Sequence, residues 1–381
     1  MQKKNSMKKK HIAMIGQKHV PSREGGVEVV VWELATRLRD AGYDVDCYNR
    51  SGYHLSARNY KKIPGKKGVY LDGIRIIIVP TVQNGKLNAI VYSALATVRA
   101  LFGHYDVIHF HAEGPCLMLW LPKLFGIRVV ATIHGLDWQR AKWGNFASRM
   151  IKAGERTAAR HADEVIVLSK DVQDYFLKEY GRKTWYIPNG IARPVHRPAR
   201  LITEKYGLCG NDYIFTLSRI VPEKGIHYLI EAYRNIDTDK KLVIAGGSGN
   251  AQEYWEQIHE MASQDSRIIL TDFVDGQLLE EICSNAYLYV LPSEVEGMSV
   301  SLLEAMSYGN CCLVSDIAEN VEVVENNAER FESANVSDLE KKIRNLIAHP
   351  ETVQKYKDAA AEFICKKYSW DLMMEATENL Y

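Results

Sequence analysis

The chain has 381 residues, 46% of them hydrophobic and 25% charged, which makes a small binding module improbable and suggests two or three domains. The net charge of +1 conceals an asymmetry: residues 1–190 hold 30 Lys and Arg against 16 Asp and Glu, whereas residues 191–381 hold 18 against 31. A basic half suits an anionic membrane surface or a phosphate-bearing ligand. Nucleic acid ranks lower as a partner, because no nucleic-acid-binding motif accompanies the scattered cations.

Targeting and redox features favour a cytoplasmic protein. The N-terminus, MQKKNSMKKK, is basic, but only four apolar residues follow before Gly16, too few for a signal peptide. The apolar stretches at 87–102 and 115–122 are too short to span a bilayer or are interrupted by Arg99. Seven cysteines without a C-x-x-C pair indicate reduced core residues, with no disulfide framework or zinc site. We therefore expect any membrane association to be peripheral, on the inner leaflet.

Short apolar runs alternate with longer amphipathic stretches along the chain. In the first half, an amphipathic helix is expected at 27–42, and strands are expected at 11–16, 43–49, 74–80, 106–112, 128–135 and 164–169. In the second half, strands are expected at 213–219, 241–247, 267–273, 286–293 and 311–316, with helices near 226–235, 251–262 and 299–308. This α/β pattern predicts two Rossmann-like domains that meet near Pro188-Asn189-Gly190 and face each other across a cleft. Ligands should bind at the carboxyl ends of the strands.

A cationic loop follows the strand YIFTL. It reads Ser218-Arg219-Ile220-Val221-Pro222-Glu223-Lys224-Gly225. Arg219, as a bidentate fork, and Lys224, as a compact charge, can neutralise a diphosphate. Taken alone, two solvated cations on a loop are an equally good interpretation.

Two carboxylates flank the start of the helix expected from Ser299. Glu296 belongs to the loop that enters the helix, and Glu304 lies just over one turn inside it. Between them the free N–H groups of the helix N-terminus form a suitable seat for a phosphate, and the carboxylates can accept hydrogen bonds from sugar hydroxyls. An ordinary acidic helix start is the competing interpretation.

Two glycine-rich loops and three histidines are the remaining candidates for the functional site. Gly25-Gly26-Val27-Glu28 and the loop 246–249 allow close backbone approach to a ligand, although neither has the spacing of a dinucleotide fingerprint. His134 follows an apolar strand and should point into the cleft. Of His109 and His111, one could face the cleft while the other packs, and a structural role is the default for both.

A metal-binding motif is weakly represented. Asp44-Val45-Asp46 has the D-x-D form that holds a divalent cation in some enzymes, but it falls within an expected strand, where alternation aims both carboxylates at one face. We therefore expect no metal and no cofactor.

In this order, the segments GGVE, TIHG, IPNG, SRxxxEKG and PSxxEGxxxxxxEAM, followed by Tyr368-Ser369-Trp370-Asp371, resemble glycosyltransferase family 4 over essentially the whole chain. The resemblance implies a retaining glycosyltransferase of the GT-B fold that uses a nucleotide diphosphate sugar and no metal. It implies an acceptor-binding domain at 1–190, a nucleotide-sugar-binding domain at 191–360, and a crossover helix at 361–381 that returns to the first domain.

The resemblance also assigns roles. Glu296 would hold donor-sugar hydroxyls, Glu304 the ribose, and Arg219 and Lys224 the diphosphate, while His134 would line the donor sugar site. The remaining donor-binding positions would be Gly25, Gly26, Val274, Asp275, Gly297, Met298, Ser299 and Val300, with Val274 and Asp275 near the nucleobase. Two departures are small: Ser299 stands where proline is frequent, and Cys311-Cys312 lies in a strand usually built of proline and β-branched residues.

The N-terminal half is similar to bacterial enzymes that build capsule, O-antigen or exopolysaccharide units. That similarity implies transfer of a hexose or rhamnose to a polyprenyl-diphosphate-linked oligosaccharide, with the basic half on the anionic inner leaflet. Two alternatives remain open: a sugar-nucleotide epimerase of the same fold, and a non-catalytic docking subunit. A phosphorylase of this fold would need a much longer chain with a pyridoxal-binding lysine.

Overall fold

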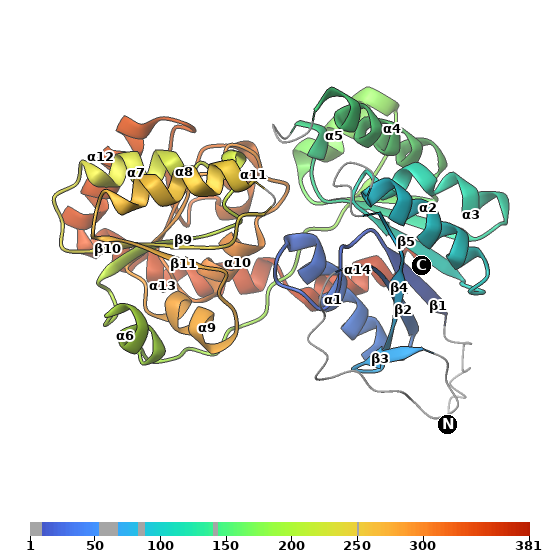
Figure 1. Cartoon of the computed structure of the whole chain (residues 1–381), viewed down its shortest axis with the longest axis horizontal. Coiled ribbons are helices and arrows are strands. Elements are labelled where there is room, and N and C mark those ends of the chain that lie inside the picture. The colour runs from blue at the N-terminus through green and yellow to red at the C-terminus, as the bar shows by residue number, and fades with distance from the viewer. Residues whose placement is uncertain (1–9, 53–67, 83–87, 140–143, 250) are drawn as a thin grey trace. The chain divides into compact units, whose positions relative to one another are not determined.

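The structure is a computed structural model that describes residues 10–52, 68–82, 88–139, 144–249 and 251–381. The described chain forms two compact units (Figure 1). Unit 1 holds the described residues up to 188 and the C-terminal segment 370–381; unit 2 holds 189–369. The chain therefore leaves unit 1 once and returns to it at its C-terminal end.

Unit 1 is built on a sheet with the strand order β3-β4-β2-β1-β5-β6-β7-β8, parallel except for the β3–β4 pair. Its strands are β1 (His11–Ile15), β2 (Asp44–Arg50), β3 (Val69–Leu71), β4 (Ile74–Val79), β5 (Val107–His111), β6 (Arg128–Ile133), β7 (Glu164–Val167) and β8 (Trp185–Tyr186). Its helices are α1 (Gly26–Asp40), α2 (Asn88–Leu101), η2 (Pro115–Met118), α3 (Trp120–Leu124), η3 (Asp137–Gln139), α4 (Asn145–His161), α5 (Lys170–Tyr180) and α14 (Trp370–Glu378).

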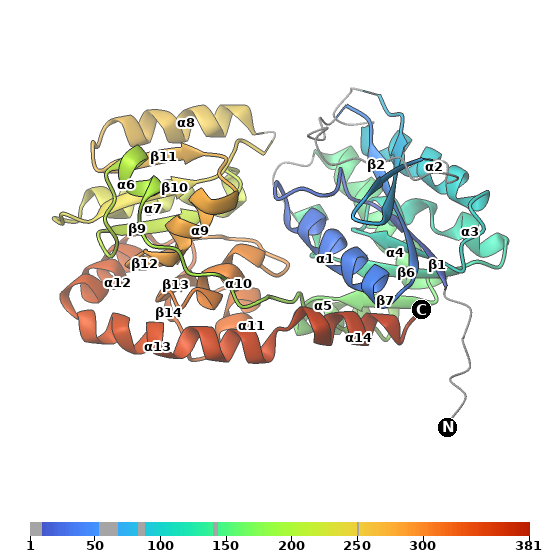
Figure 2. The same ribbon diagram turned by 90° about the horizontal axis from the view of Figure 1, so that it is seen from below.

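Helices cover both faces of this sheet. On one face α1 packs against α14, and the Arg37 guanidinium lies 5.6 Å from the ring centroid of Trp370. On the other face α2, α3, α4 and α5 follow one another (Figures 1 and 2). Alternate strand residues such as Ala13 and Ile15 join the buried cluster beneath α2 and α4, as expected for strands buried on both faces.

Unit 2 has a parallel sheet with the order β11-β10-β9-β12-β13-β14. Its strands are β9 (Tyr213–Leu217), β10 (Lys241–Ala245), β11 (Ile268–Asp272), β12 (Leu288–Leu291), β13 (Cys312–Ser315) and β14 (Glu329–Phe331). Its helices are α6 (Leu201–Tyr206), η4 (Pro222–Lys224), α7 (Ile226–Arg234), α8 (Gln252–Ser263), α9 (Gly276–Ser284), α10 (Val300–Ser307), α11 (Ala318–Val324), α12 (Val336–Ala348) and α13 (Pro350–Lys367). Helices α7, α8 and α12 cover one face, and α9, α10 and α13 lie over the other (Figure 1).

Each sheet reverses its strand order at its first strand. In unit 2 the first strand, β9, lies between β10 and β12; in unit 1, β1 lies between β2 and β5. The loops that leave the two strands on either side of such a point diverge, and ligands of open parallel sheets bind there. The loops after β9 and β12, and those after β1 and β5, are therefore the places to look for chemistry.

The expected α/β architecture with two Rossmann-like sheets is confirmed, and each expected strand is present. The sequence analysis missed the short strands β3, β8 and β14. Residues 361–381 do not form one helix, because α13 ends at Lys367 and the extended Ser369 bridges Ile191 before α14 begins. All seven cysteines are free and five of them are buried, but Cys209 is exposed and Cys365 is half-buried. No helix within the described ranges has both the length and the apolar character needed to cross a bilayer.

Candidate functional site

The cationic loop of unit 2 leaves β9 at the reversal of strand order. Arg219 is half-buried two residues after the strand, and Lys224 ends the short helix η4. Gly225 follows with φ of +65°, and a Cβ there would stand 2.1 Å from the carbonyl oxygen of Pro292, just beyond β12. Only glycine fits this crossing, because any other side chain would collide with the backbone of the adjacent loop.

The close approach of Gly225 to Pro292 brings together the cationic loop and the loop that carries Glu296. The Nζ of Lys224 forms an ion pair and hydrogen bond with Oε1 of Glu296, which lies in the loop after β12. Their side chains are only 12% and 6% exposed. Because two charges withdrawn from water need mutual pairing, each of these residues holds the other in place.

Helix α10 begins beside this ion pair. Ser299 is its N-cap, and its Oγ accepts a hydrogen bond from the N–H of Leu302 at 3.3 Å. Gly297, Met298 and Ser299 are buried, and Val300 is the first helical residue. Glu304 is half-buried further along the helix. The positive end of the α10 dipole therefore lies next to Glu296.

Asn189 supports this loop and was not assigned a role by the sequence analysis. It is buried, its N–H lies 3.1 Å from Sδ of Met298, and its Nδ2 donates to the carbonyl of Met298 at 3.4 Å. The sequence signal available was the Pro188-Asn189-Gly190 turn, which was interpreted as a domain boundary and as part of the IPNG segment. Its asparagine also braces the start of α10.

The glycine loop after β10 packs on the cationic loop. Gly246 has φ of +146°, and a Cβ there would be 1.7 Å from the carbonyl oxygen of Ser218. The N–H of Ile220 donates to the carbonyl of Gly247 at 2.8 Å, and a Cβ on Gly249 would touch Arg219 at 3.2 Å. The loop 246–249 thus shapes the backbone around Arg219.

The two positions expected near a nucleobase follow β11. Val274 is buried and Asp275 is exposed as the N-cap residue of α9. Between β11 and Val274, Phe273 is 47% exposed and lies across from Gly247. An exposed aromatic ring at the carboxyl end of a strand is a candidate stacking surface that the sequence analysis passed over.

The other candidate residues lie in unit 1. Gly25 is the N-cap of α1, and Gly26 is its first residue. A Cβ on Gly25 would meet Oε2 of Glu28 at 2.4 Å, and Oε1 of the same carboxylate accepts from the N–H of Lys18 at 2.9 Å. The glycine therefore leaves room for Glu28 to fold back and tie the loop after β1 to the helix start.

His134 follows β6 and is half-buried. Its Nε2 lies 3.2 Å from Nδ1 of His111, whose ring stacks on His109 with centroids 4.1 Å apart. The expectation that one of His109 and His111 faces the cleft while the other packs is wrong, because both are fully buried. Residues two apart in a strand lie on the same face of the sheet. His109 is satisfied by Tyr381 Oη and Thr132 Oγ1, both at 2.7 Å.

Burial controls the protonation of this histidine group. Desolvation lowers the pKa of His109 to about 3 and lowers the pKa of His111 well below its usual value. Both rings are therefore neutral at ordinary pH. Nε2 of His111 has no hydrogen-bond partner within the described residues, so its contact with His134 is its polar anchor.

A buried carboxyl braces the loop that follows His134. Oε2 of Glu113 accepts from the N–H of Asp137 at 2.8 Å. Desolvation, with Asp137 and Glu155 nearby, raises the pKa of Glu113 well above its usual value. Glu155 in turn accepts from Trp138 Nε1 at 2.9 Å. Glu113 follows β5 and Glu155 lies on α4, and nothing in the sequence indicated that either carboxyl group is buried.

The D-x-D segment lies in β2, as expected. Asp44 is exposed, and Asp46 is buried, accepting from Tyr105 Oη at 2.6 Å and pairing with His11 at 3.3 Å. Its carboxylate therefore serves the core of unit 1. In the part of the chain that the structure describes, no three His, Cys, Asp or Glu side chains are grouped as metal ligands.

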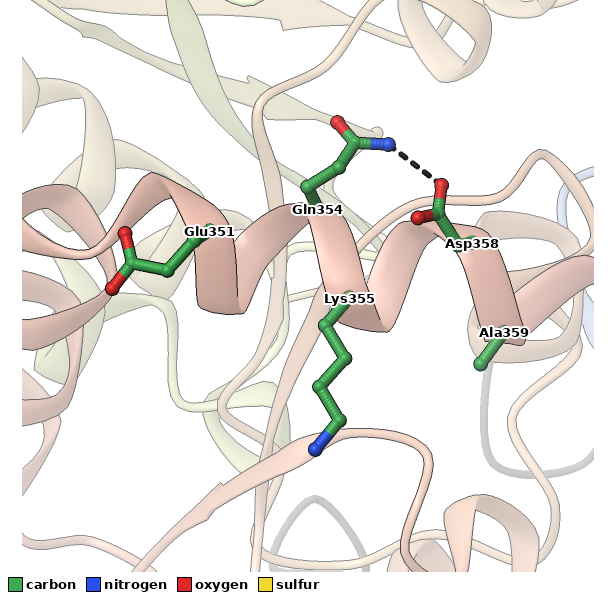
Figure 3. A pocket seen from close by; sticks show the side chains of 5 residues that line it. All are labelled: Glu351, Gln354, Lys355, Asp358 and Ala359. Carbon is green, nitrogen blue, oxygen red and sulfur yellow. Dashed lines mark hydrogen bonds between the residues drawn. The ribbon is translucent and has the colours of Figure 1, made fainter.

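A hollow of about 570 Å³ lies away from these residues, along α13 (Figure 3). Its lining residues, Glu351, Gln354, Lys355, Asp358 and Ala359, all belong to that one helix. Gln354 Nε2 donates to Asp358 Oδ1 at 2.7 Å. We assign no chemistry to it, because a single helix surface supplies no converging groups.

Solved structures of other proteins share this fold. Sucrose-phosphate synthase from Thermosynechococcus elongatus superposes with a TM-score of 0.81 at 20% identity, covering 98% of both chains. Anabaena HepE in complex with UDP and glucose gives 0.79 at 16% identity, covering 98% of this chain and 99% of that one. The two Rossmann-like units thus have the GT-B fold of glycosyltransferases.

Family models and curated relatives are more specific. Residues 24–193 match the model Glycosyltransferase Family 4, and residues 202–363 match Glycosyl transferases group 1. The α-maltose-1-phosphate synthase of Mycolicibacterium smegmatis is 25% identical over 97% of this chain and 98% of its own. The UDP-Gal:α-D-GlcNAc-diphosphoundecaprenol α-1,3-galactosyltransferase of Escherichia coli is 27% identical over 68% of this chain and 71% of its own. The chain belongs to glycosyltransferase family 4 and is a glycosyltransferase.

Proposed function

We propose that the protein transfers a hexose or rhamnose, with retention, from a nucleotide diphosphate donor to a polyprenyl-diphosphate-linked oligosaccharide in bacterial surface polysaccharide synthesis. It needs no metal and no other cofactor for this reaction, and it works on the cytoplasmic side of the cell membrane. The donor site lies in unit 2 and the acceptor site in unit 1.

One observation carries the donor assignment. At the reversal of strand order in unit 2, the loops after β9 and β12 bring Lys224 and Glu296 into contact beside the N-terminus of α10. A cation, a helix N-terminus and an acceptor of hydroxyl hydrogen bonds are what a diphosphate linked to a sugar requires. HepE, which has the same fold, was solved with UDP and glucose.

The proposed roles follow from this arrangement. Arg219, Lys224 and the N–H groups of Met298, Ser299 and Val300 stabilise the charge that develops on the departing diphosphate. Glu296 and Glu304 accept hydrogen bonds from sugar and ribose hydroxyls. Gly297 lets the backbone approach the phosphates. For Gly25 and Gly26 we propose a phosphate contact, and for His134 a contact with the donor sugar, on the family resemblance alone. Val274 and Asp275 contact the base.

Retention follows from a same-face transfer, which we also propose. The departing phosphate oxygen takes the proton of the acceptor hydroxyl while that hydroxyl attacks the anomeric carbon from the same side. Because Arg219 and Lys224 can carry the charge of the leaving group, this chemistry does not require a divalent cation.

The acceptor proposal rests on charge and on one relative. The E. coli relative is named for an acceptor joined to undecaprenol through a diphosphate. The basic character of residues 1–190, 30 Lys and Arg against 16 Asp and Glu, suits such an anion and an anionic inner leaflet. Much of the N-terminal lysine cluster, Lys3, Lys4, Lys8 and Lys9, lies outside the described residues, as do Lys61, Lys62, Lys66 and Lys67; Lys10 donates to the carbonyl of Tyr381 at 2.6 Å.

A second acceptor class deserves a direct comparison. The mycobacterial relative, which aligns along 97% of the chain, is named for making α-maltose 1-phosphate. A soluble sugar phosphate would also suit a basic acceptor unit. Parallel assays with a lipid-diphosphate oligosaccharide and with glucose 1-phosphate decide between them, because each acceptor gives a distinct product mass.

A thermal-shift screen with UDP, dTDP, GDP and ADP tests the donor site. We expect one nucleotide to raise the melting temperature, because a ligand at about 100 times its Kd stabilises the folded state by about 2.7 kcal/mol. Lys224→Met should abolish that shift, and Lys241→Met, on β10, should keep it. If none of the four nucleotides raises the melting temperature of the wild-type protein, the assigned site is wrong.

A further inference from the structure

An apolar surface covers helices α2 and α3 of unit 1. Six large side chains form it, and we name it the α2–α3 surface. Their exposed fractions are 78% for Phe102, 73% for Leu124, 66% for Phe125, 44% for Val98, 43% for Leu95 and 42% for Trp120. Single exposed apolar residues are ordinary on soluble proteins, but several together mark a surface that meets another apolar body.

The six side chains lie on neighbouring helix faces. Leu95 and Val98 lie on α2, and Phe102 directly follows its last residue, Leu101. Their spacing of three and four residues puts them along one side of the C-terminal end of the helix. Trp120 and Leu124 are spaced by four on α3, and Phe125 caps that helix. The two helices are in contact and lie side by side in both views (Figures 1 and 2).

The opposite stripe of α2 packs in the core. Tyr92, Ala96 and Ala100 are fully buried beneath it. Helix α2 is therefore apolar on both its buried and its outer face. A helix of that kind is normally enclosed on all sides. Within the part of the chain that the structure describes, Leu95, Val98 and Phe102 nevertheless remain exposed.

Charge distinguishes an anionic lipid surface from other partners. Neither α2 nor α3 carries an acidic residue; their charged residues are Arg99 and Lys123. Lys123 pairs with Asp163 at 2.6 Å, while the exposed Arg99 donates to the carbonyl of Ile78 at 3.1 Å. Large apolar side chains with cations and no carboxylates on the same helices fit a bilayer interface of negative charge.

We propose that the α2–α3 surface inserts into the interface of an anionic bilayer and holds the protein at the membrane where a lipid-linked acceptor is presented. This inference rests on the proposed function for its biological setting. It assigns the contact to apolar side chains, whereas the sequence analysis expected lysines to make it. Phe102, Leu124 and Phe125, the three most exposed of the six side chains, are the anchoring residues.

Vesicle co-sedimentation of the whole protein tests the proposal. One set of vesicles contains phosphatidylglycerol and phosphatidylcholine in equal parts, and the other contains phosphatidylcholine alone. The test variant combines Phe102→Ser, Leu124→Ser and Phe125→Ser. The control combines Leu177→Ser, Val195→Ser and Leu372→Ser, which are 52%, 60% and 55% exposed elsewhere on the chain.

We expect the wild-type protein and the control to bind the anionic vesicles, and the test variant to bind at least about tenfold more weakly, since burial of apolar groups drives interfacial binding. Unchanged near-ultraviolet circular dichroism shows that each variant is folded. The proposal is overturned if wild type and test variant bind equally, or if the wild-type protein does not bind. Self-association of lipid-free wild type that the test variant loses, without vesicle binding, would instead assign the surface to a second copy.

The same proteins separate this inference from the proposed function. Sugar transfer is measured with a water-soluble, short-chain acceptor and with a polyprenyl acceptor embedded in the anionic vesicles. The test variant should keep its rate on the soluble acceptor and lose rate on the embedded one. If the wild-type protein transfers to neither acceptor yet binds the vesicles through this surface, the acceptor proposal fails and the membrane inference stands.

Discussion

Lys224 and Glu296 show how single residues define the proposed donor site. They are 72 positions apart and meet because β9 and β12 are neighbours in the sheet. The two charges pair with each other. A bound diphosphate would add a second anion beside Lys224, so the pair also keeps the lysine close to where a phosphate would sit.

Two substitutions test the donor site at this scale. Arg219→Ala and Glu304→Gln should each weaken nucleotide-sugar binding by about 1.5 to 3 kcal/mol, because each removes one charge-assisted contact. Both side chains are half-buried, so the variants should remain folded. Arg234→Ala, at an exposed position on α7, serves as the control and should bind normally. Calorimetry on folded protein measures the affinities; unchanged binding in both variants would remove these residues from the site.

The buried histidines predict a loss of stability in acid. His109, whose pKa burial lowers to about 3, and His111, whose pKa is also lowered, stay neutral in the folded protein, whereas an unfolded histidine titrates near 6.5. Below that value the unfolded chain binds more protons than the folded chain. The free energy of unfolding should therefore fall, as the pH falls from 6.5, by about 1 kcal/mol per pH unit for each histidine.

Urea unfolding at about pH 7, 6 and 5 measures this slope. His109→Gln should make the dependence of the unfolding free energy on pH shallower, by the contribution of roughly one proton bound by the unfolded chain. This holds whatever the effect of the substitution on stability at neutral pH. Equal slopes for wild type and His109→Gln would contradict the assignment of a neutral buried imidazole.

At the scale of elements, both sheets have a glycine in the loop that follows their first strand, where that loop closely approaches the end of a neighbouring strand. The loop leaving β1 passes the end of β5 at Gly16, where a Cβ would be 2.0 Å from the carbonyl oxygen of His111. The loop leaving β9 passes the end of β12 at Gly225 in the same way, 2.1 Å from the carbonyl oxygen of Pro292. A glycine at each reversal of strand order therefore lets the backbones of neighbouring loops approach closely.

Gly225→Ala should lower the free energy of unfolding by much more than its left-handed backbone conformation alone predicts. Gly181 is the matched control, since its φ of +62° resembles the +65° of Gly225 but nothing lies within 4 Å of its missing Cβ. Gly181→Ala should cost about 1 kcal/mol for the left-handed conformation. Gly225→Ala should cost about 3 kcal/mol or more, because a backbone clash is added. Denaturant unfolding compares the two, and equal losses would show that the crossing tolerates a side chain.

At the scale of the whole molecule, α14 is the part of the C-terminal sequence that belongs to unit 1. Arg37 pairs with Asp371 at 3.4 Å, Tyr43 donates to Glu378 at 2.6 Å, and Arg128 donates to the carbonyl of Leu380 at 2.8 Å. The hydroxyl of Tyr381 reaches His109 at 2.7 Å. The end of the chain thus completes the buried surface of the unit formed mainly by residues before 189.

Deleting residues 370–381 should destabilise unit 1 selectively. Trp370, Met373, Leu380 and Tyr381 are buried, and their removal exposes the apolar surface that they cover. Calorimetry should show a lowered transition for unit 1 and a preserved one for unit 2. The milder Tyr381→Phe should cost about 1 to 3 kcal/mol, the range for an unsatisfied buried polar group, and Leu372→Ser, on the exposed side of α14, should cost little. A deletion that lowers neither transition would refute the docking role.

The reaction of the whole enzyme provides the last prediction. Activity should survive EDTA, because in the proposed mechanism Arg219, Lys224 and the N-terminus of α10 stabilise the leaving diphosphate. The anomeric configuration of the product, measured by NMR, should match that of the donor. Activity that EDTA abolishes and Mn²⁺ restores would overturn the metal proposal, and an inverted product would overturn the same-face mechanism.

Much of the fold could be predicted from the sequence. For the candidate site, the sequence predicted only the types of residue and their separations along the chain. Apolar alternation located the main strands, and the separation of Glu296 from Glu304 placed one carboxylate before α10 and one within it. The spacing did not reveal that Lys224 would pair with Glu296, or that Asn189 would brace Met298. These contacts join segments far apart in sequence, and local periodicity carries no information about such pairs.

The sequence by itself determined the order of strands and helices and the family motifs, because backbone periodicity and local loop chemistry are properties of neighbouring residues. Only the tertiary structure decided which loops meet, since strand order in a parallel sheet differs from chain order: β9 follows β8 in the chain but lies between β10 and β12 in the sheet. It also decided that His109 and His111 are both buried and that the apolar stripe of α2 remains exposed. Burial depends on which elements pack against which, and that depends on the complete set of contacts in each unit.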